Sequence, residues 1–153
     1  MNEETRMLVG CPSMDAFRRM HKDSGKGFWG LDYDFVWLGY LYDSRGRMYK
    51  APVAVVDYRR SIDEKLEFSH VCAYNHELKQ GKRVFIIAGP DDGTPTDTEP
   101  FYVSEFLGGD YRPDPVAYET VGVGVFRSLF EFKEWQSELR DEIMESSNPR
   151  VSS

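Results

Sequence analysis

Close-spaced cysteine and histidine pairs are missing from this sequence. The 153 residues include 2 Cys and 3 His. Cys11 and Cys72 lie far apart, which favours two reduced thiols over a disulfide. His70 and His76 are six positions apart and do not share a helix face, so surface or helix-capping roles are expected for them rather than joint metal ligation.

Long apolar runs are also missing. No stretch approaches the roughly 20 apolar residues that span a bilayer, so we expect no membrane partner. The acidic start, residues 1–4, is not followed by a secretory apolar segment, and we expect a cytoplasmic protein. With 41% hydrophobic and 14% aromatic residues, the chain is long and apolar enough for one folded domain.

Excess positive charge is absent as well, since the formal net charge is −7. This balance argues against a nucleic-acid binder held by bulk electrostatics alone. The charge is unevenly distributed: residues 1–83 carry 14 Lys and Arg against 12 Asp and Glu, and residues 84–153 carry 5 against 14. A polyanion would therefore meet the first half of the chain.

The sequence divides into a loose N-terminus (residues 1–12), a single α/β domain (residues 13–145) and a frayed tail (residues 146–153). A short helix is predicted over residues 13–20, with a serine as its N-cap. One face of that helix carries basic side chains, which either contact phosphate or form a solvated helix face; they are Arg18, Arg19 and Lys22.

Two runs of β-branched and aromatic residues, 31–38 and 51–60, predict paired strands. The polar stretch 43–47 contains a glycine and is typical of the turn of a hairpin. Both runs carry carboxylates, which a plain core strand would lack. This contradiction is the main clue to function in the sequence.

A strand–helix–strand unit is predicted next. Ser61 and Glu64 have the spacing of a capping box, so a helix should run from there to about Gln80 and stop at Gly81. The continuously apolar stretch 83–89 predicts a central strand covered on both faces. A loop is expected over residues 90–97.

The remaining chain predicts an edge strand over residues 101–107 and a terminal helix. Gly122 and Gly124 lack the third glycine of a dinucleotide fingerprint and are given no such role. Ser128 opens the terminal helix, whose apolar stripe at helical spacing predicts core packing; its members are Phe132, Trp135, Leu139 and Ile143. The expected fold is a mixed β-sheet flanked by helices.

Side chains two apart share one face of a strand, so Asp32 and Asp34 should point the same way, and so should Asp57 and Arg59. If the two faces meet, carboxylates and one guanidinium converge at a strand end, as in a hard-cation site for Mg²⁺ or Mn²⁺. Such a site suits phosphodiester hydrolysis. The alternative is a strand-end ion pair between Asp57 and Arg59 with nothing bound.

The segments Asp32-Tyr33-Asp34 and Val55-Val56-Asp57-Tyr58-Arg59, followed by a helix and an apolar strand, resemble the PD-(D/E)xK nuclease superfamily, particularly its small, phage-associated members. The resemblance covers residues 13–107 and implies a restriction-endonuclease-like core in the order αββαβ. It implies metal binding by Asp34, Asp57 and the Tyr58 carbonyl, with support from Asp32. DNA is the implied partner, and homodimerisation is expected for cuts in both strands.

Arg59 stands where the family has lysine. An arginine stays protonated and cannot accept a proton, although it can hold a phosphate or a water. Either the site acts by electrostatics, or Lys50 or Arg60 contributes, or the domain binds without cutting. Asp34, Asp57 and Arg59 are the predicted catalytic residues, and Arg60 joins the basic helix face as a predicted DNA contact.

Three functions follow from this reading. The first is a metal-dependent nuclease that acts on DNA. The second is a catalytically inactive nuclease-like module that binds nucleic acid or a protein partner. The third is a small structural or immunity-type protein whose acidic second half docks on a basic partner.

Overall fold

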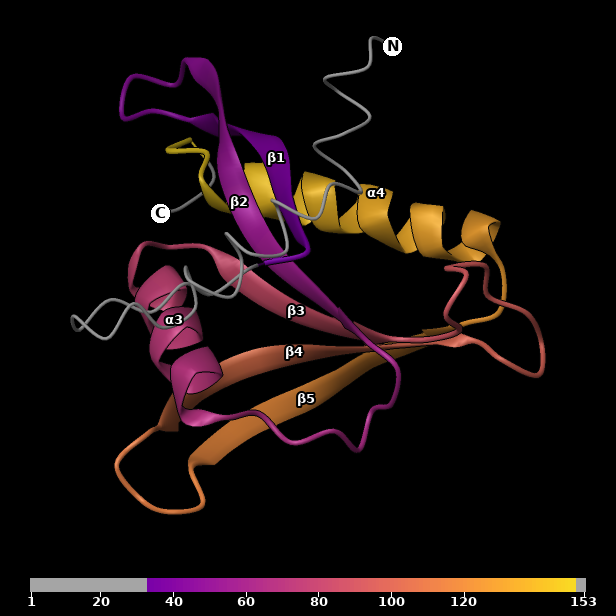
Figure 1. Cartoon of the computed structure of the whole chain (residues 1–153). Helices are drawn as coiled ribbons and strands as arrows, with labels where there is room; N and C mark the ends of the chain where they lie inside the picture. The colour runs from indigo at the N-terminus through magenta and orange to yellow at the C-terminus, as the bar shows by residue number, and fades with distance from the viewer. Residues whose placement is uncertain (1–32, 151–153) are drawn as a thin grey trace, which may run out of the picture. The chain divides into compact units, whose positions relative to one another are not determined.

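The computed structural model describes residues 33–150. They form five strands and two helices (Figure 1): β1 Phe35–Tyr42, β2 Met48–Arg59, α3 Phe68–Lys79, β3 Arg83–Ala88, β4 Phe101–Asp110, β5 Ala117–Phe126 and α4 Leu129–Ser146. The predicted class, a mixed sheet with flanking helices, is confirmed. The helix predicted over residues 13–20 lies outside the described residues.

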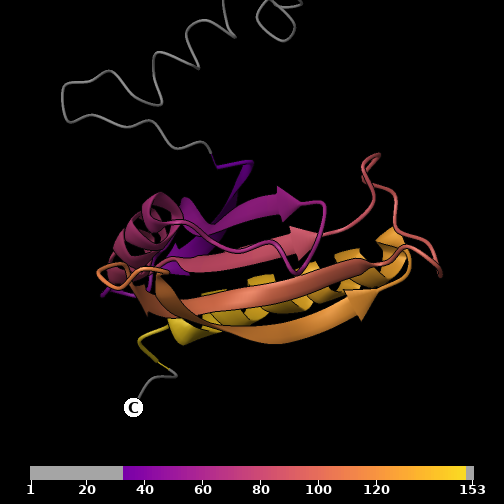
Figure 2. The ribbon, with the colours of Figure 1, turned by 60° about the horizontal axis from the view of Figure 1, so that its bottom comes forward.

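The sheet has the strand order β1-β2-β3-β4-β5. β2 and β3 are parallel, and the other neighbouring pairs are antiparallel. A parallel pair needs a crossover connection, which α3 provides. The predicted strand–helix–strand unit is therefore present, with β3 as the buried central strand. β4 and β5 are long and curve together along one side of the sheet (Figure 2).

The predicted hairpin is confirmed, with strand limits that differ from the expected ones. β1 begins at Phe35, so Asp34 precedes the strand instead of lying within it. The turn is closed by a hydrogen bond from the Asp43 amide to the Arg47 carbonyl at 2.8 Å. Gly46 has a φ of 78°, a conformation that side chains with a Cβ disfavour.

α3 begins later than predicted. Its N-cap is Glu67, whose side chain accepts from the backbone while the His70 ring accepts from the Glu67 amide at 3.3 Å. The Ser61 hydroxyl instead accepts from the Asp63 amide at 3.2 Å, which makes a local turn. The capping-box prediction at Ser61 is therefore wrong, whereas the predicted stop at Gly81, with a φ of 83°, is confirmed.

The alternation of side chains along the central strands separates two apolar cores. Phe85 and Ile87 of β3 face α4 and pack with Leu139. The neighbouring β3 side chains face the other way, toward α3, where Val71 and Tyr74 are fully buried. The domain is therefore a three-layer arrangement of helix, sheet and helix.

β4 is not the edge strand that was predicted. It lies between β3 and β5, because residues 117–126 form a further strand that the sequence reading missed. Gly122 and Gly124 lie within β5, so they belong to a strand rather than to a nucleotide-binding turn. Register shifts in the β4–β5 ladder occur at Val103/Ser104 and Phe106/Gly108.

The terminal helix is confirmed as α4. The Ser128 hydroxyl accepts from the Glu131 amide at 3.2 Å, as a serine N-cap should. The predicted apolar stripe packs on the sheet and is dominated by aromatic rings set edge to face, including Phe132 and Trp135 against Trp37. Within residues 33–150, no helix has the length and apolarity that crossing a membrane requires.

Leu139 tests how much the contact between α4 and the sheet contributes to stability. Its side chain is 5% exposed in the α4 core. Leu139→Ala should lower the free energy of unfolding by about 2–4 kcal/mol, because it removes buried apolar surface and leaves a cavity. Urea denaturation followed by circular dichroism measures this loss.

The matched control is Phe130→Ala on the same helix. Phe130 is 70% exposed, so its removal should change the free energy of unfolding by less than about 0.5 kcal/mol. Equal losses for the two variants would contradict the assignment of the buried face of α4.

Candidate functional site

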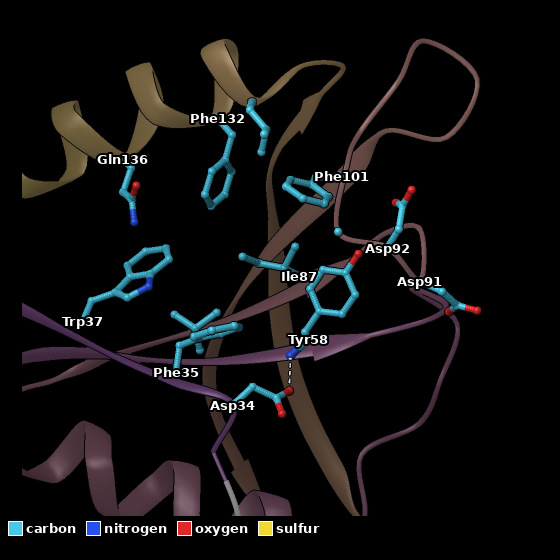
Figure 3. A pocket seen from close by; sticks show the side chains of 13 residues that line it. Asp34, Phe35, Trp37, Tyr58, Ile87, Asp91, Asp92, Phe101, Phe132 and Gln136 are labelled. Carbon is cyan, nitrogen blue, oxygen red and sulfur yellow. Dashed lines mark hydrogen bonds between the residues drawn. The ribbon is translucent and has the colours of Figure 1, made fainter. Parts of the chain in front are cut away.

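The site begins where β1 and β2 pair. Phe35 lies opposite Val56, and Asp34 therefore comes to the level of Asp57. The Asp34 amide donates to Asp57 Oδ1 at 3.1 Å, and the Tyr58 amide donates to Asp34 Oδ2 at 2.7 Å, a bond drawn in Figure 3. These two hydrogen bonds hold the two aspartates together at the strand end.

Alternation along β2 places the next side chains on different faces of the sheet. Asp57 faces α3 and accepts a hydrogen bond from the Tyr74 hydroxyl. Tyr58 faces the α4 side, where its ring packs against Phe101 with centroids 6.0 Å apart. Asp57 is 5% exposed, whereas Asp34 is exposed, so a ligand would reach the pair from the Asp34 side.

Arg59 lies on the same face as Asp57 and is also mostly buried. Its side chain is 10% exposed, and its Nη1 lies 3.5 Å from Glu64 Oε2. Burial lowers the pKa of the guanidinium, but the nearby Tyr74 oxygen and the charges of Glu64 and Asp57 outweigh it and hold the pKa above its ordinary value. Arg59 is thus a permanent positive charge.

The Nε atom of Arg59 is buried without a hydrogen-bond partner among the described residues. Buried polar atoms in folded proteins are nearly always paired, and an unpaired one is a place to look for a ligand or a bound water. This donor therefore leaves the guanidinium with hydrogen-bonding capacity for a further oxygen.

Two tyrosines border the carboxylates: Tyr33 is partly buried and Tyr74 is fully buried. Burial, and then the charges of Glu77 and Asp57, raise the pKa of Tyr33 to about 12. Burial and the hydrogen bond to Asp57 also raise the pKa of Tyr74. Both phenols therefore stay protonated near neutral pH, and Tyr74 acts as a hydrogen-bond donor rather than as a base.

The predicted site residues are only partly described. Asp34 is hydrogen-bonded to Asp57 and to Tyr58, and the side chains of Asp57 and Arg59 share one face of β2. Arg60 forms an ion pair with Asp91 instead: its Nε lies 3.4 Å from Asp91 Oδ1, and both side chains are largely exposed. The other predicted residues lie outside the described residues; they are Arg18, Arg19, Lys22 and Asp32.

Lys50, which the sequence offered as a substitute for the missing lysine, lies nine residues from Arg59 along β2. At about 3.3 Å per residue the two positions are roughly 30 Å apart. Lys50 instead sits over the ring of Tyr40, 5.8 Å from its centroid. It does not contribute to the carboxylate site.

Tyr74, Glu64 and His70 were not predicted as neighbours of the carboxylates. The sequence could have indicated Tyr74, because it lies three residues after Val71 and so on the same face of the helix. A buried tyrosine then needs a partner for its hydroxyl. The role of Glu64 depended on where α3 begins, which the sequence reading placed too early. The capping role expected for a histidine is confirmed at His70.

The donors at the strand end suit a hard divalent cation. No group of three or more His, Cys, Asp or Glu side chains is arranged for a metal within residues 33–150. Mg²⁺, however, is commonly held by one or two carboxylates together with substrate phosphates and waters. Asp34 and Asp57 supply two carboxylates, and each carboxylate oxygen has more than one lone pair, so their present hydrogen bonds do not use up their capacity as acceptors.

Comparison of the chain with protein-family models, with curated proteins and with solved structures found no match.

Tyr74→Phe tests the hydrogen bond that holds Asp57. The change leaves a buried carboxylate oxygen without its donor, so the free energy of unfolding should fall by about 1–3 kcal/mol. Urea denaturation gives the value. Tyr49→Phe, at a tyrosine 46% exposed, is the control and should have no measurable effect. A Tyr74→Phe protein as stable as the wild type would show that the bond is not needed.

The surroundings of His70 predict how the free energy of unfolding depends on pH. Burial, and then the positive charge of Arg59, lower its pKa below the ordinary value of 6.5, against the opposing charges of Asp57, Glu67 and Glu64. The unfolded chain therefore takes up the proton first, and stability should fall as the pH drops through 6.5. Protonation would also remove the ring acceptor that the Glu67 amide uses.

His70→Gln keeps an acceptor for the Glu67 amide and does not titrate. Its free energy of unfolding should therefore vary less than that of the wild type between about pH 7.5 and about pH 5.5. His76→Gln, at an exposed position of the same helix, is the control and should follow the wild type. An unchanged pH dependence in His70→Gln would refute the assignment.

Proposed function

We propose that this chain is a metal-dependent nuclease that hydrolyses phosphodiester bonds in DNA. The observation that carries the proposal is the pairing of Asp34 with Asp57 at the strand end, beside the permanent charge of Arg59. The order of elements gives further support, because β1, β2, α3 and β3 follow the ββαβ part of the restriction-endonuclease-like core.

The roles follow from chemistry and exposure. Asp34 and Asp57, with the Tyr58 carbonyl, would hold Mg²⁺ or Mn²⁺, and Asp32 would support them. The bound metal would polarise the phosphate and lower the pKa of a water. The water oxygen forms a bond to phosphorus, the bond to the leaving sugar oxygen breaks, and one proton from the water ends on that sugar oxygen.

Arg59 would hold a phosphate oxygen through its guanidinium. Tyr74 keeps the Asp57 carboxylate in place through its hydroxyl. The proposed contacts to the DNA backbone are Arg18, Arg19, Lys22 and Arg60.

A second candidate is favoured by the arginine at position 59. A guanidinium that stays protonated does not accept the proton of the attacking water, and, against the effect of burial, the Tyr74 oxygen with the charges of Glu64 and Asp57 holds the pKa of Arg59 above its ordinary value. The chain would then be a catalytically inactive nuclease-like module that binds nucleic acid or a protein partner.

The test is cleavage of plasmid and single-stranded DNA by the purified protein with Mg²⁺, Mn²⁺ or EDTA. Asp57→Asn should reduce the metal-dependent rate by more than the roughly 10–100-fold typical of losing an outer-shell partner. Asp97→Asn, at an exposed loop carboxylate, should retain the wild-type rate. Arg59→Lys should raise the rate, because an amine can exchange a proton with water.

The two candidates separate in the same experiment. DNA binding without cleavage, in the wild type and in Arg59→Lys, would favour the inactive module. If the protein neither cleaves nor binds DNA, both nucleic-acid proposals are overturned. Cleavage that survives Asp57→Asn would place the active site elsewhere.

A further inference from the structure

A cavity of about 590 Å³ opens on the α4 face of the sheet, the face opposite the Asp57 and Arg59 side chains (Figure 3). It lies between the start of β1, the ends of β2 and β3, the loop after β3 and the first turns of α4. Its volume is within the range of about 300–1,000 Å³ that is usual for small-molecule sites. Asp34 also belongs to the carboxylate pair, and the nuclease proposal uses no other side chain of the cavity lining.

Five of the 13 residues that line the cavity are aromatic: Phe35, Trp37, Tyr58, Phe101 and Phe132. Phe101 and Phe132 stand edge to face with centroids 5.3 Å apart and an interplanar angle of 80°. Tyr58 also packs edge to face against Phe101, and Trp37 packs edge to face against Phe132. The rings fix one another, so the wall is largely formed before any ligand arrives.

Every charged side chain that lines this cavity is a carboxylate: Asp34, Asp91 and Asp92. No lysine, arginine or histidine is part of the lining. The Tyr58 hydroxyl donates to the Pro90 carbonyl and so ties the loop that carries Asp91 and Asp92 to the cavity mouth.

We propose that this cavity binds an organic cation, an ammonium group carried on an apolar body. Aromatic faces attract a cation through their quadrupole, and Asp34 and Asp92 at the rim add to that attraction, whereas the charge of Asp91 is offset by Arg60, whose Nε lies 3.4 Å from Asp91 Oδ1. An anion of the same shape would be repelled by the rim. The apolar body is required because Val56, Ile87 and Leu129 complete the wall and offer it no polar partner.

The ammonium group has two possible sources, a free amine and a lysine-type side chain of another protein. Both present the same chemistry to the aromatic wall. The amide of Gln136, which Figure 3 shows pointing from α4 toward Trp37, gives either source one polar contact inside the cavity.

The test compares three soluble probes of similar shape, using isothermal titration calorimetry on the full chain. Benzyltrimethylammonium should bind at least about fivefold more tightly than benzyl alcohol, and phenylacetate should bind most weakly. A peptide with one trimethyllysine forms a second arm. Binding of the free cation alone assigns the cavity to a free amine, and binding of both probes assigns it to a side chain as well.

Variants locate the binding. Phe35→Leu removes one ring of the wall at a residue that is 55% exposed, so the fold should tolerate the change. Asp92→Asn removes one rim charge and keeps the oxygen that accepts from the Thr94 amide at 2.9 Å. Each variant should weaken cation binding about threefold or more.

Matched controls make the same changes outside the cavity. Phe130→Leu alters a ring that is 70% exposed, and Asp97→Asn alters another carboxylate of the same loop; both should bind the cation as the wild type does. Equal binding of the cation, alcohol and anion would overturn the proposal, and so would cation binding that none of the cavity variants weakens. Cleavage of DNA plays no part in these readouts, so this proposal and the nuclease proposal can fail separately.

Discussion

The hydrogen bonds between the end of β2 and the residue before β1 are the constraint on which the candidate site depends. The Asp34 amide donates to the Asp57 carboxylate, and the Asp34 carboxylate accepts from the Tyr58 amide. The hydrogen bonding between β1 and β2 therefore continues one residue beyond the start of β1. Without this step, the hydrogen bonding between β1 and β2 would stop at Phe35, and Asp34 would be free to turn into solvent. The buried carboxylate of Asp57 would also lose one of its donors, which is unfavourable away from water.

Asp34 and Tyr58 connect the two sites, and Asp34 does so because it pairs with Asp57 and also lines the cavity. The Tyr58 amide belongs to the carboxylate pair, and the Tyr58 ring belongs to the wall of the cavity. The pleat of β2 explains this division, because adjacent residues of a strand serve opposite faces of the sheet. The sequence Asp-Tyr-Arg therefore places two charged side chains on one face and an aromatic ring on the other.

Sequence reasoning found the parts of the fold that local patterns determine. The hairpin, the strand–helix–strand unit and α4 could be predicted because turn residues, a continuous apolar run and helical spacing each act over short distances. It missed β5, whose side chains are mostly exposed and which contains Gly122 and Gly124, so no clear alternation marks it. Its strand character comes from pairing with β4, which is a tertiary effect.

The start of α3 and the surroundings of Asp57 show the same limit. Two capping patterns compete within a few residues, and the turn at Ser61 uses the hydroxyl that the predicted cap needed. The contact of Asp34 with Asp57 depends on the register of β1 and β2, whereas the shared face of Asp57 and Arg59 could be expected from strand periodicity alone. The hydroxyl of Tyr74 and the aromatic cavity could not, because both depend on how the helices rest on the sheet.

The strand order has a consequence for how the chain folds. Strands that are neighbours in the sheet are also consecutive along the chain, so each new strand joins an edge that the preceding one has just formed. The entropy of loop closure is then lost in small steps, which favours rapid folding. The hydrogen bond from the Tyr42 amide to the Ser147 hydroxyl spans 105 residues, so the two ends of this part of the chain meet only when α4 has docked against β1.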